Sequence, residues 1–375
     1  MPVKSLYIHI PFCIRKCLYC DFFSIPFDQS LTEEYIHALL IEIDIRSKDL
    51  HELKTIYIGG GTPTVVTVQE FEKLFKGLKG IPWSKDIEIT IEANPCTISR
   101  EKIRYLMDQG VNRFSLGIQS FIDRDLEVLG RIHTSLEGMR AIEVMKKEGI
   151  KNLSIDLIYG IPGQSMKEWQ FNLSKAIEYH PEHLSTYELT PERETPIYDL
   201  IAKGGVKKPD DDTILNMYHR AIEDLTSAGY VHYEISNFAI RGVQCRHNLN
   251  YWDRGEYIGV GAGAHSFEGN KRRVNIRDVR RYIDALKGGS LLFEEEIEVT
   301  PEEALKEQIF LGLRKTDGIS RNLLRERFQI DVIPDLSDFE REGLLKIRDD
   351  HIRLTRKGII VSNSLIVKLF EILGL

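Results

Sequence analysis

The sequence predicts an α/β fold built on a parallel β-sheet, and three observations support this class. Six short runs rich in β-branched and aromatic residues alternate with five helical patterns over residues 4–189. Most of these runs are apolar nearly throughout, as expected of strands that are buried on both faces. Cysteines, glycines and acidic residues gather where the runs end, and both barrels and open sheets place their sites there. The alternation fits a doubly wound sheet and a sheet that curls into a barrel.

The individual elements follow from local patterns. Strands are predicted over residues 4–10, 55–59, 88–93, 113–119, 152–159 and 184–189. Helices are predicted over residues 32–47, 67–79, 99–109, 135–148 and 166–179. Thr32, Thr67 and Ser99 are of residue types that cap helix N-termini, and Gly110 and Gly149 fit the position that follows a C-cap.

The remaining residues are expected to form two further parts. Residues 191–300 contain a predicted helix at 211–228 and then a loop at 242–269 that is rich in glycine, histidine and aromatic residues. From residue 301, helices at 301–313, 321–328 and near 336–341 and a hairpin over 344–355 are typical of a winged-helix module. Such modules bind DNA or serve as packing domains, and this one lacks a basic recognition helix, so no nucleic-acid partner is expected. The amphipathic run 359–375 is expected to dock on the module, with a membrane contact as the weaker alternative.

Composition and charge restrict the class of protein. Of the 375 residues 42% are hydrophobic and 29% are charged, which excludes a disordered or fibrous chain. The formal net charge of −7 gives no global basic field for nucleic acid. No apolar run reaches the roughly 18 residues that a membrane span needs, and the N-terminus has no signal-peptide pattern. A cytoplasmic location is expected, with the inner face of the membrane as an open alternative.

Three of the five cysteines lie within eight residues, directly after the first predicted strand. Cys13, Cys17 and Cys20 form a C-x3-C-x2-C run, which favours a shared metal centre over inert buried thiols. Zinc is one interpretation, with His9 or Cys96 as the fourth ligand, although structural zinc sites usually carry two separated ligand pairs. An iron–sulfur cluster with one iron open to an exogenous ligand is the other.

This cysteine run and the glycine-rich loop at 59–63 (GGGTP) resemble the radical S-adenosylmethionine superfamily. In that superfamily three such cysteines hold a [4Fe–4S] cluster, and S-adenosylmethionine binds the fourth iron. The resemblance implies a partial (βα)6 TIM-like barrel over residues 1–190. The chain is then divided into this barrel, a connecting segment at 191–300, and an α+β, winged-helix-like C-terminal domain at 301–375.

Further segments resemble the coproporphyrinogen oxidase-like branch of this superfamily. They are residues 7–13 (YIHIPFC), 92–95 (EANP), 116–121 (LGIQSF), 130–133 (GRIH) and 156–162 (DLIYGIP). Glycines allow close backbone approach to a ligand, and an arginine offers a planar fork to a carboxylate. The resemblance implies that S-adenosylmethionine is bound by Tyr7, Tyr19, Gly60, Gly61, Thr62, Glu92, Gln119, Arg131 and Asp156.

Two departures separate the chain from the oxygen-independent coproporphyrinogen III oxidases of this branch. Those oxidases carry a fourth cysteine where this chain has Phe22, and they have a long N-terminal extension, whereas Tyr7 comes here almost at once. Both features resemble the HemW-type heme chaperones. An H-N-x-x-Y-W motif at 247–252 agrees, because in that family the motif is implicated in heme binding. His247 is therefore the candidate heme ligand, and Cys245 and His265 are lesser candidates.

The resemblance implies a heme chaperone that binds heme, a [4Fe–4S] cluster and S-adenosylmethionine and delivers heme to respiratory-type acceptor proteins. A reductant protein is a further expected partner, and turnover of a substrate stays open. The alternative is an oxygen-independent coproporphyrinogen III oxidase; an unrelated radical methylase or isomerase fits the barrel but not the motif at 247–252.

One basic run remains outside these motifs. Residues 271–281 contain six basic side chains and one acidic side chain. We expect a solvated basic helix here, and contact with heme propionates, an anionic membrane or an acidic partner is the functional alternative.

Overall fold

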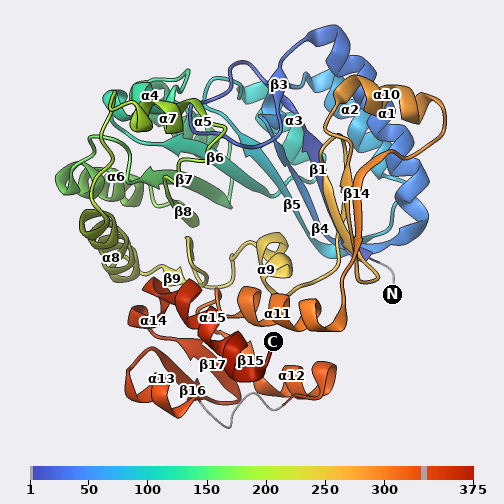
Figure 1. Cartoon of the computed structure of the whole chain (residues 1–375). Coiled ribbons are helices and arrows are strands. Elements are labelled where there is room, and N and C mark those ends of the chain that lie inside the picture. Colours follow the sequence, from blue (N-terminus) through green and yellow to red (C-terminus); the bar gives the residue numbers. More distant parts are fainter. Residues whose placement is uncertain (1–2, 331–335) are drawn as a thin grey trace.

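The computed structural model describes residues 3–330 and 336–375 (Figure 1). Its centre is a nine-stranded sheet with the strand order β11-β1-β4-β5-β6-β7-β8-β10-β9. The six predicted strands form the parallel middle of this sheet. They are β1 (Val3–Ile10), β4 (Leu50–Gly60), β5 (Trp83–Ala93), β6 (Arg113–Gln119), β7 (Leu153–Tyr159) and β8 (His183–Glu188).

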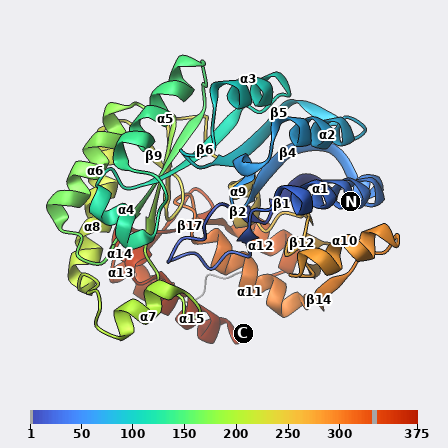
Figure 2. The ribbon, with the colours of Figure 1, turned by 90° about the horizontal axis from the view of Figure 1, so that it is seen from above.

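The sheet curls into a partial barrel whose outer surface is covered by helices (Figure 2). The predicted helices are α1 (Gln29–Arg46), α2 (Val68–Leu78), α3 (Arg100–Asp108), α5 (Ser135–Lys147) and α6 (Met166–Glu178). Within the described ranges no pairing joins β11 to β9, so the barrel stays open. The fold class is confirmed, and of the two arrangements that fit the alternation the structure has the barrel.

The strands are less uniformly apolar than predicted, because only their outer face packs against the helices. Ile56, Ile91 and Ile155 are fully buried in the hydrophobic core under these helices. The alternate residues point into the lumen of the barrel and are largely polar, and they form hydrogen bonds from strand to strand. The lumen is therefore a polar chamber, and the strands follow the period-2 alternation of a two-faced sheet.

Residues 191–300 complete both sides of the sheet. After α8 (Asp211–Ser227), strands β9 (Val231–His232) and β10 (Asn237–Ala239) extend the β8 side. Strand β11 (Ile258–Val260) pairs in parallel with β1. The predicted loop at 242–269 is thus partly wrong, because it contains α9 (Arg246–Trp252), β11 and β12 (His265–Glu268).

The predicted basic helix at 271–281 is also wrong in its first half. Residues Lys271–Asn275 form strand β13, which pairs with the acidic strand β14 (Phe293–Glu298); only α10 (Val279–Lys287) is helical. Arg273 forms ion pairs with Glu268 and Glu296, and Arg272 with Glu307. Most of the charge of this strand is therefore neutralised within the molecule.

Helix ends follow the predicted capping residues with one exception. Thr67 and Ser99 cap α2 and α3, and Gly110 and Gly149 adopt positive φ values of 97° and 86°. Thr32 is not a cap, because α1 begins one turn earlier, where the Asp28 side chain accepts a hydrogen bond from the Leu31 N–H at 2.8 Å. The short helices α4 (Asp123–Leu129) and α7 (Pro196–Ala202) were not predicted.

The C-terminal part has its own hydrophobic cluster and lies below the barrel in Figure 1. It combines α11 (Pro301–Gly312), α12 (Arg321–Phe328) and α13 (Ser337–Arg341) with a small sheet in the order β15 (Ile319–Ser320), β17 (His351–Leu354), β16 (Leu345–Arg348). Helices α14 (Arg356–Ile360) and α15 (Ser362–Leu373) follow, and α15 buries Leu365, Ile366 and Leu369 in the cluster, as predicted. The division of the chain at residues 190 and 300 stays a prediction. Among the helices of the described residues, none has the length and apolarity that crossing a membrane requires.

Candidate functional site

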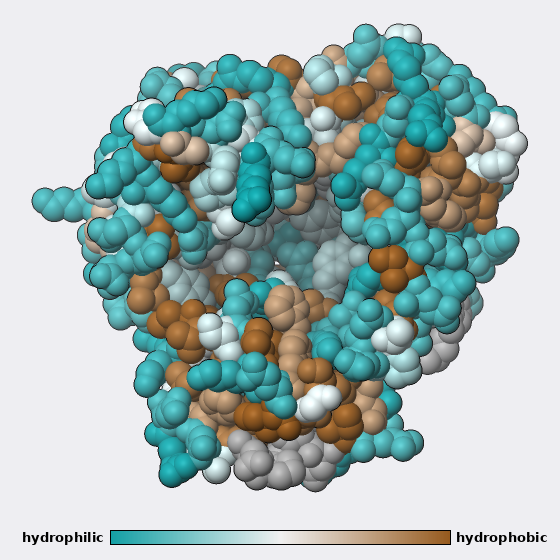
Figure 3. Space-filling model, in the orientation of Figure 1, coloured by the Kyte–Doolittle hydropathy of each residue, from teal (hydrophilic) through white to brown (hydrophobic). Residues whose placement is uncertain are grey.

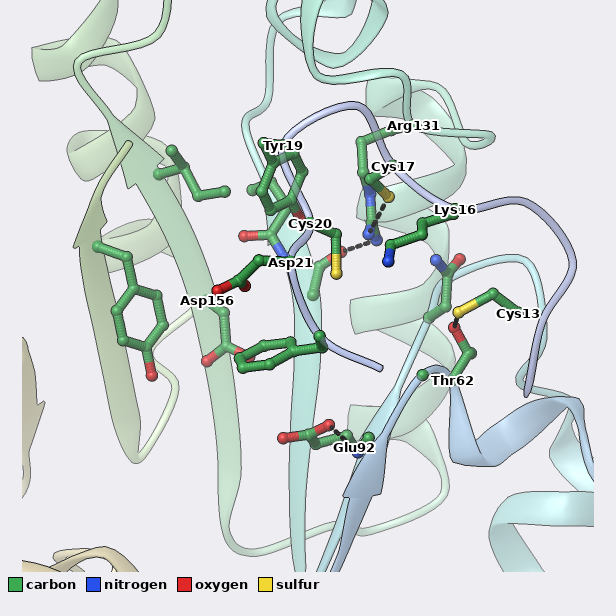
Figure 4. Close-up of a pocket in the computed structure, with 18 of the residues that line it drawn as sticks. Cys13, Lys16, Cys17, Tyr19, Cys20, Asp21, Thr62, Glu92, Arg131 and Asp156 are labelled. Atoms are coloured by element: carbon green, nitrogen blue, oxygen red, sulfur yellow. Dashed lines mark hydrogen bonds between the residues drawn. The ribbon is translucent and has the colours of Figure 1, made fainter. Parts of the chain in front are cut away.

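A cavity of about 440 Å³ lies at the C-terminal ends of the barrel strands, beside the loop that carries the three cysteines (Figure 4). Eleven of the thirteen predicted site residues line it. They are Cys13, Cys17, Tyr19, Cys20, Gly60, Gly61, Thr62, Glu92, Gln119, Arg131 and Asp156. Tyr7 and His247 are not among the lining residues. In the view of Figure 3 the centre of the molecule is hollowed, and hydrophilic side chains form most of the rim.

The cysteine loop is held at both ends by backbone hydrogen bonds. Strand β2 (Phe12–Cys13) pairs with β3 (Ile25–Pro26), and the Phe27 N–H donates to the Cys13 carbonyl at 2.8 Å. The glycine-rich loop is attached to the same segment, since the Gly61 N–H donates to the carbonyl of Ile10 at 2.9 Å. The cysteine loop and the glycine loop therefore form one unit at the edge of the cavity.

The three thiol groups face one region of the cavity (Figure 4). Cys13 Sγ lies 3.6 Å from Thr62 Oγ1, and Cys17 Sγ accepts a hydrogen bond from Arg131 Nη1 at 3.4 Å. Burial raises the pKa of the Cys13 thiol and raises that of Cys20 to about 11. Among the described residues no three metal-binding side chains converge on a single ion. A cubane cluster has no such requirement, because each thiolate binds a different iron atom.

Two polar groups of the cavity wall are buried without a hydrogen-bond partner within the described chain. They are Gln119 Oε1 and Arg131 Nε. Gln119 also has a φ of 67°, a left-handed conformation that is strained for a residue other than glycine. Because unpaired buried polar groups and backbone strain concentrate at ligand sites, this wall fits a ligand that carries its own hydrogen-bonding groups.

Two half-buried carboxyl groups form the floor of the cavity. Glu92 accepts hydrogen bonds from Tyr57 Oη at 2.8 Å and from the Gly60 N–H at 3.2 Å, and Asp156 accepts from Ser115 Oγ at 2.9 Å. Burial raises the pKa of Glu92 to about 7 and, with hydrogen bonds opposing it, raises the pKa of Asp156 as well. Such a floor can accept hydrogen bonds from ribose hydroxyls and can hold a cation. The cavity therefore fits S-adenosylmethionine, which carries both.

Two aromatic side chains that reach the cavity from the barrel strands were not predicted. Tyr57 and Tyr187 both line it, from β4 and β8. Tyr57 lies two residues from Thr55 and two residues from Gly59 on β4. Residues two apart in a strand point to the same face, so Tyr57 faces the lumen as they do. This period-2 pattern is the sequence signal that could have predicted Tyr57 as a cavity residue. Its hydroxyl donates the hydrogen bond to Glu92.

Tyr7 and His247 do not line the cavity, and both pack against the lining residue Tyr57. The Tyr7 hydroxyl is 3.0 Å from His9 Nδ1, and its ring packs against Tyr57 with the centroids 6.1 Å apart. His247 lies on α9 and is 0% exposed. Its Nδ1 is 2.8 Å from Thr55 Oγ1 and its Nε2 is 2.8 Å from Tyr251 Oη, so both ring nitrogens are engaged. Ligation of heme by His247 stays a prediction, and in this arrangement neither nitrogen is free. Of the lesser candidates, Cys245 is buried and His265 is exposed on β12.

Comparison with known families identifies two regions of the chain. Residues 7–173 match the radical SAM superfamily, and residues 299–361 match the HemN C-terminal domain. The first match contains all three cysteines and the whole floor of the cavity. It confirms the predicted superfamily and, with it, a [4Fe–4S] cluster and S-adenosylmethionine as the cofactors in place of zinc.

A solved structure supports the fold over the full length. The structure resembles a coproporphyrinogen III oxidase (HemN) from Escherichia coli with a TM-score of 0.84 and 22% sequence identity, over 98% of this chain and 90% of that chain. At this identity the likeness concerns the fold alone.

Sequence relatives are much closer. The heme chaperone HemW of Bacillus subtilis (strain 168) is 38% identical over 370 residues, which cover 96% of this chain and 98% of that protein. The heme chaperone HemW of Escherichia coli (strain K12) is 37% identical over 380 residues, covering 98% of both chains. Because these matches run through the barrel, the connecting segment and the C-terminal part, the chain belongs to the HemW family of heme chaperones within the radical SAM superfamily.

Proposed function

We propose that this protein is a heme chaperone that binds heme and passes it to acceptor proteins. The observation that carries the proposal is the full-length similarity to proteins named heme chaperone HemW, at 38% and 37% identity. Respiratory-type heme proteins are the proposed acceptors.

Cys13, Cys17 and Cys20 are the proposed cluster ligands, and the cavity wall and floor are the proposed S-adenosylmethionine site. When bound, this pair supplies one-electron chemistry. Arg131 donates a hydrogen bond to the Cys17 sulfur at 3.4 Å, and hydrogen bonds to cluster sulfurs tune the reduction potential. Its unpaired Nε and the unpaired Oε1 of Gln119 would meet polar groups of the nucleotide. Glu92 and Asp156 would accept from its hydroxyl groups.

Phe22 is the proposed contact for the heme cargo. It stands where the oxidases carry a fourth cysteine, lines the cavity and is 65% exposed. An exposed aromatic ring at the mouth of a cavity offers an apolar face to a tetrapyrrole, which stacks well on aromatic side chains. We therefore place the heme cargo against the mouth of the cavity.

The second candidate function, coproporphyrinogen III oxidation, follows from the structural likeness to HemN. One anaerobic assay separates the two. The reconstituted protein is incubated with S-adenosylmethionine, a reductant and coproporphyrinogen III, and in parallel loaded with heme and mixed with an apo-cytochrome. We expect heme transfer and no protoporphyrinogen. Sustained conversion to protoporphyrinogen IX, with no transfer of heme, would replace the chaperone by the oxidase.

Two partners complete the proposal. A reductant protein would approach the cysteine loop, where Arg15 and Lys16 favour an acidic surface. Contact with the inner face of the membrane would use α15, where Val367 and Ile372 are exposed. Co-sedimentation with vesicles containing anionic lipid tests the second point, and an equal loss of binding in Val367→Glu and in an unrelated surface variant would count against it.

A further inference from the structure

The H-N-x-x-Y-W motif at 247–252 packs inside the barrel, against the lumen face of β4. His247 Nδ1 is 2.8 Å from Thr55 Oγ1, and the His247 ring stacks on Tyr57 with centroids 5.2 Å apart and planes inclined by 30°. Thr55 and Tyr57 are alternate residues of one strand, so they present the same face to His247. The imidazole therefore lies over two neighbouring positions of the strand.

The other side of the imidazole is closed by the motif itself. Tyr251 Oη lies 2.8 Å from His247 Nε2, and the two rings meet nearly perpendicularly at 83° with centroids 4.9 Å apart. Tyr251 in turn packs against Tyr257 at 4.6 Å. Burial lowers the pKa of His247 to about 3, so the ring is neutral, with one nitrogen that donates and one that accepts. The hydroxyl groups of Thr55 and Tyr251 can each donate or accept, so together they can complete both hydrogen bonds of the ring.

Helix α9, which carries the motif, is tied to the neighbouring strand β5. The backbone N–H groups of Arg246 and His247 donate to the two carboxylate oxygens of Glu88 at 2.9 and 3.0 Å. Arg246 Nη1 also pairs with Asp86 at 3.0 Å. The first turn of the helix is therefore fixed on the strand that carries Glu92 at its far end.

The chain of contacts ends at the floor of the cofactor cavity. The Tyr57 ring is held between Tyr7 and His247, and its hydroxyl donates to Glu92 Oε1 at 2.8 Å. Glu92 Oε2 accepts from the Gly60 N–H, which belongs to the glycine-rich loop. From these contacts we infer that His247 and Tyr251 are positioning residues for the S-adenosylmethionine site, acting through Tyr57 on Glu92, and are not heme ligands. The inference rests on the proposed function only in taking S-adenosylmethionine as the ligand of this cavity.

The test measures S-adenosylmethionine and heme affinity separately, by anaerobic calorimetry and by absorbance titration of the cluster-loaded protein. Tyr57→Phe removes only the hydroxyl, and His247→Ala removes the ring that holds Tyr57. We expect each to weaken S-adenosylmethionine binding about tenfold, because each costs Glu92 a hydrogen bond or its position. Heme affinity should stay within about twofold of the native value. The matched control is His37→Ala, an exposed histidine on α1.

A pH profile distinguishes positioning from general loosening of the fold. The hydrogen bond from Tyr57 lowers the pKa of Glu92, so its loss moves that pKa further above about 7. The pH midpoint of S-adenosylmethionine binding should therefore move upward in Tyr57→Phe and His247→Ala. The double variant should show no more than the larger single effect, because both act through one contact. His247→Gln, whose amide can donate and accept, should recover part of the affinity.

The opposite result in these titrations would overturn the inference. Native S-adenosylmethionine affinity and midpoint in His247→Ala, together with lost heme binding, would overturn the inference and restore His247 as the heme ligand. If His247→Ala fails to fold, Tyr57→Phe and His247→Gln carry the test. Absence of heme binding by the native protein would instead count against the chaperone proposal and leave the positioning result untouched.

Discussion

Gly61, in the glycine-rich loop at the edge of the cavity, has no room for a side chain. A Cβ placed there would lie 2.8 Å from the Phe12 carbonyl oxygen and 3.0 Å from Cys13 Sγ. The first neighbour is backbone and is itself bonded to the glycine loop, because the Thr62 N–H donates to it at 2.8 Å. The restriction at this position is thus one of space and not of backbone conformation.

We expect Gly61→Ala to lower cluster occupancy at least several-fold, because the methyl group must push the first cysteine out of its place. Iron and sulfide content and the sulfur-to-iron absorbance after reconstitution measure the effect. Gly80→Ala is the control, since its nearest neighbour is 3.9 Å away. Native iron content in Gly61→Ala would show that the loop relaxes without loss of the cluster.

At the scale of elements, a single carboxylate joins α1 to the part of the chain that follows the barrel. Glu42 is buried on α1 and accepts hydrogen bonds from the Gly261 N–H and from Asn275 Nδ2, both at 2.7 Å, and from the Tyr282 hydroxyl. These donors belong to the end of β11, to β13 and to α10. The carboxylate therefore attaches the last strand on this side of the barrel.

Glu42→Ala removes the acceptor of three buried donors, of which Asn275 Nδ2 keeps its hydrogen bond to the Gly261 carbonyl at 2.9 Å. We expect the change to reduce the free energy of unfolding by about 3 kcal/mol. The loss should be local first, so hydrogen exchange of β11 and α10 should accelerate before that of β5 and β6. Glu33→Ala on the exposed face of the same helix is the matched control. Uniform acceleration over the whole barrel would contradict a local role for Glu42.

Within the C-terminal part, helix α15 has one buried and one exposed face. Leu369 is buried in the hydrophobic cluster, whereas Val367 is 54% exposed. Leu369→Ala should cost about 3 kcal/mol through lost burial and the cavity left behind. Val367→Ala should change stability by less than about 0.5 kcal/mol. Denaturant unfolding measures both, and equal effects would mean that α15 does not dock as described.

On the scale of the whole molecule, the barrel side and the C-terminal part meet at residues 233–235. The Ile235 N–H donates to the Arg314 carbonyl and the Thr316 N–H to the Tyr233 carbonyl, each at 3.1 Å. Glu234, between them, is 0% exposed, and burial raises its pKa to about 7 from an ordinary value of 4.5. A titratable group thus lies at this junction.

The raised pKa of Glu234 determines how the stability of the protein depends on pH. The folded state binds this proton more tightly than the unfolded state, so the stabilisation is complete below about pH 4.5 and is lost as the pH rises through about 7. Glu234→Gln resembles the protonated form. We expect it to exceed the native protein in stability at pH 9 by up to about 3 kcal/mol and to match it at pH 4. Thermal unfolding at both pH values is the measurement, and parallel pH profiles would refute the assignment.

Much of the fold was predictable because its signals are local. β6 and α12 have the predicted bounds, and Thr67 and Ser99 cap the predicted helices. Strand β11 was missed because Ile258 and Val260, although β-branched, form a run of only three residues in a glycine-rich stretch. The run is ordered by pairing with β1, over 240 positions away in the chain. The basic run at 271–275 was read as a helix because its strand form depends on pairing with β12 and with the acidic β14, and the run itself does not show this pairing.

The sequence by itself determined the cofactor class and most of the site, because three thiols on one short loop and motifs at strand ends are local features that the βα order brings to one edge. Tertiary structure alone decided the place of His247. Its neighbours Thr55 and Tyr57 lie 190 or more residues away, and only packing shows that they engage one ring nitrogen and one ring face. A motif can record which side chains are present, but whether a nitrogen is free depends on the partners that folding brings to it.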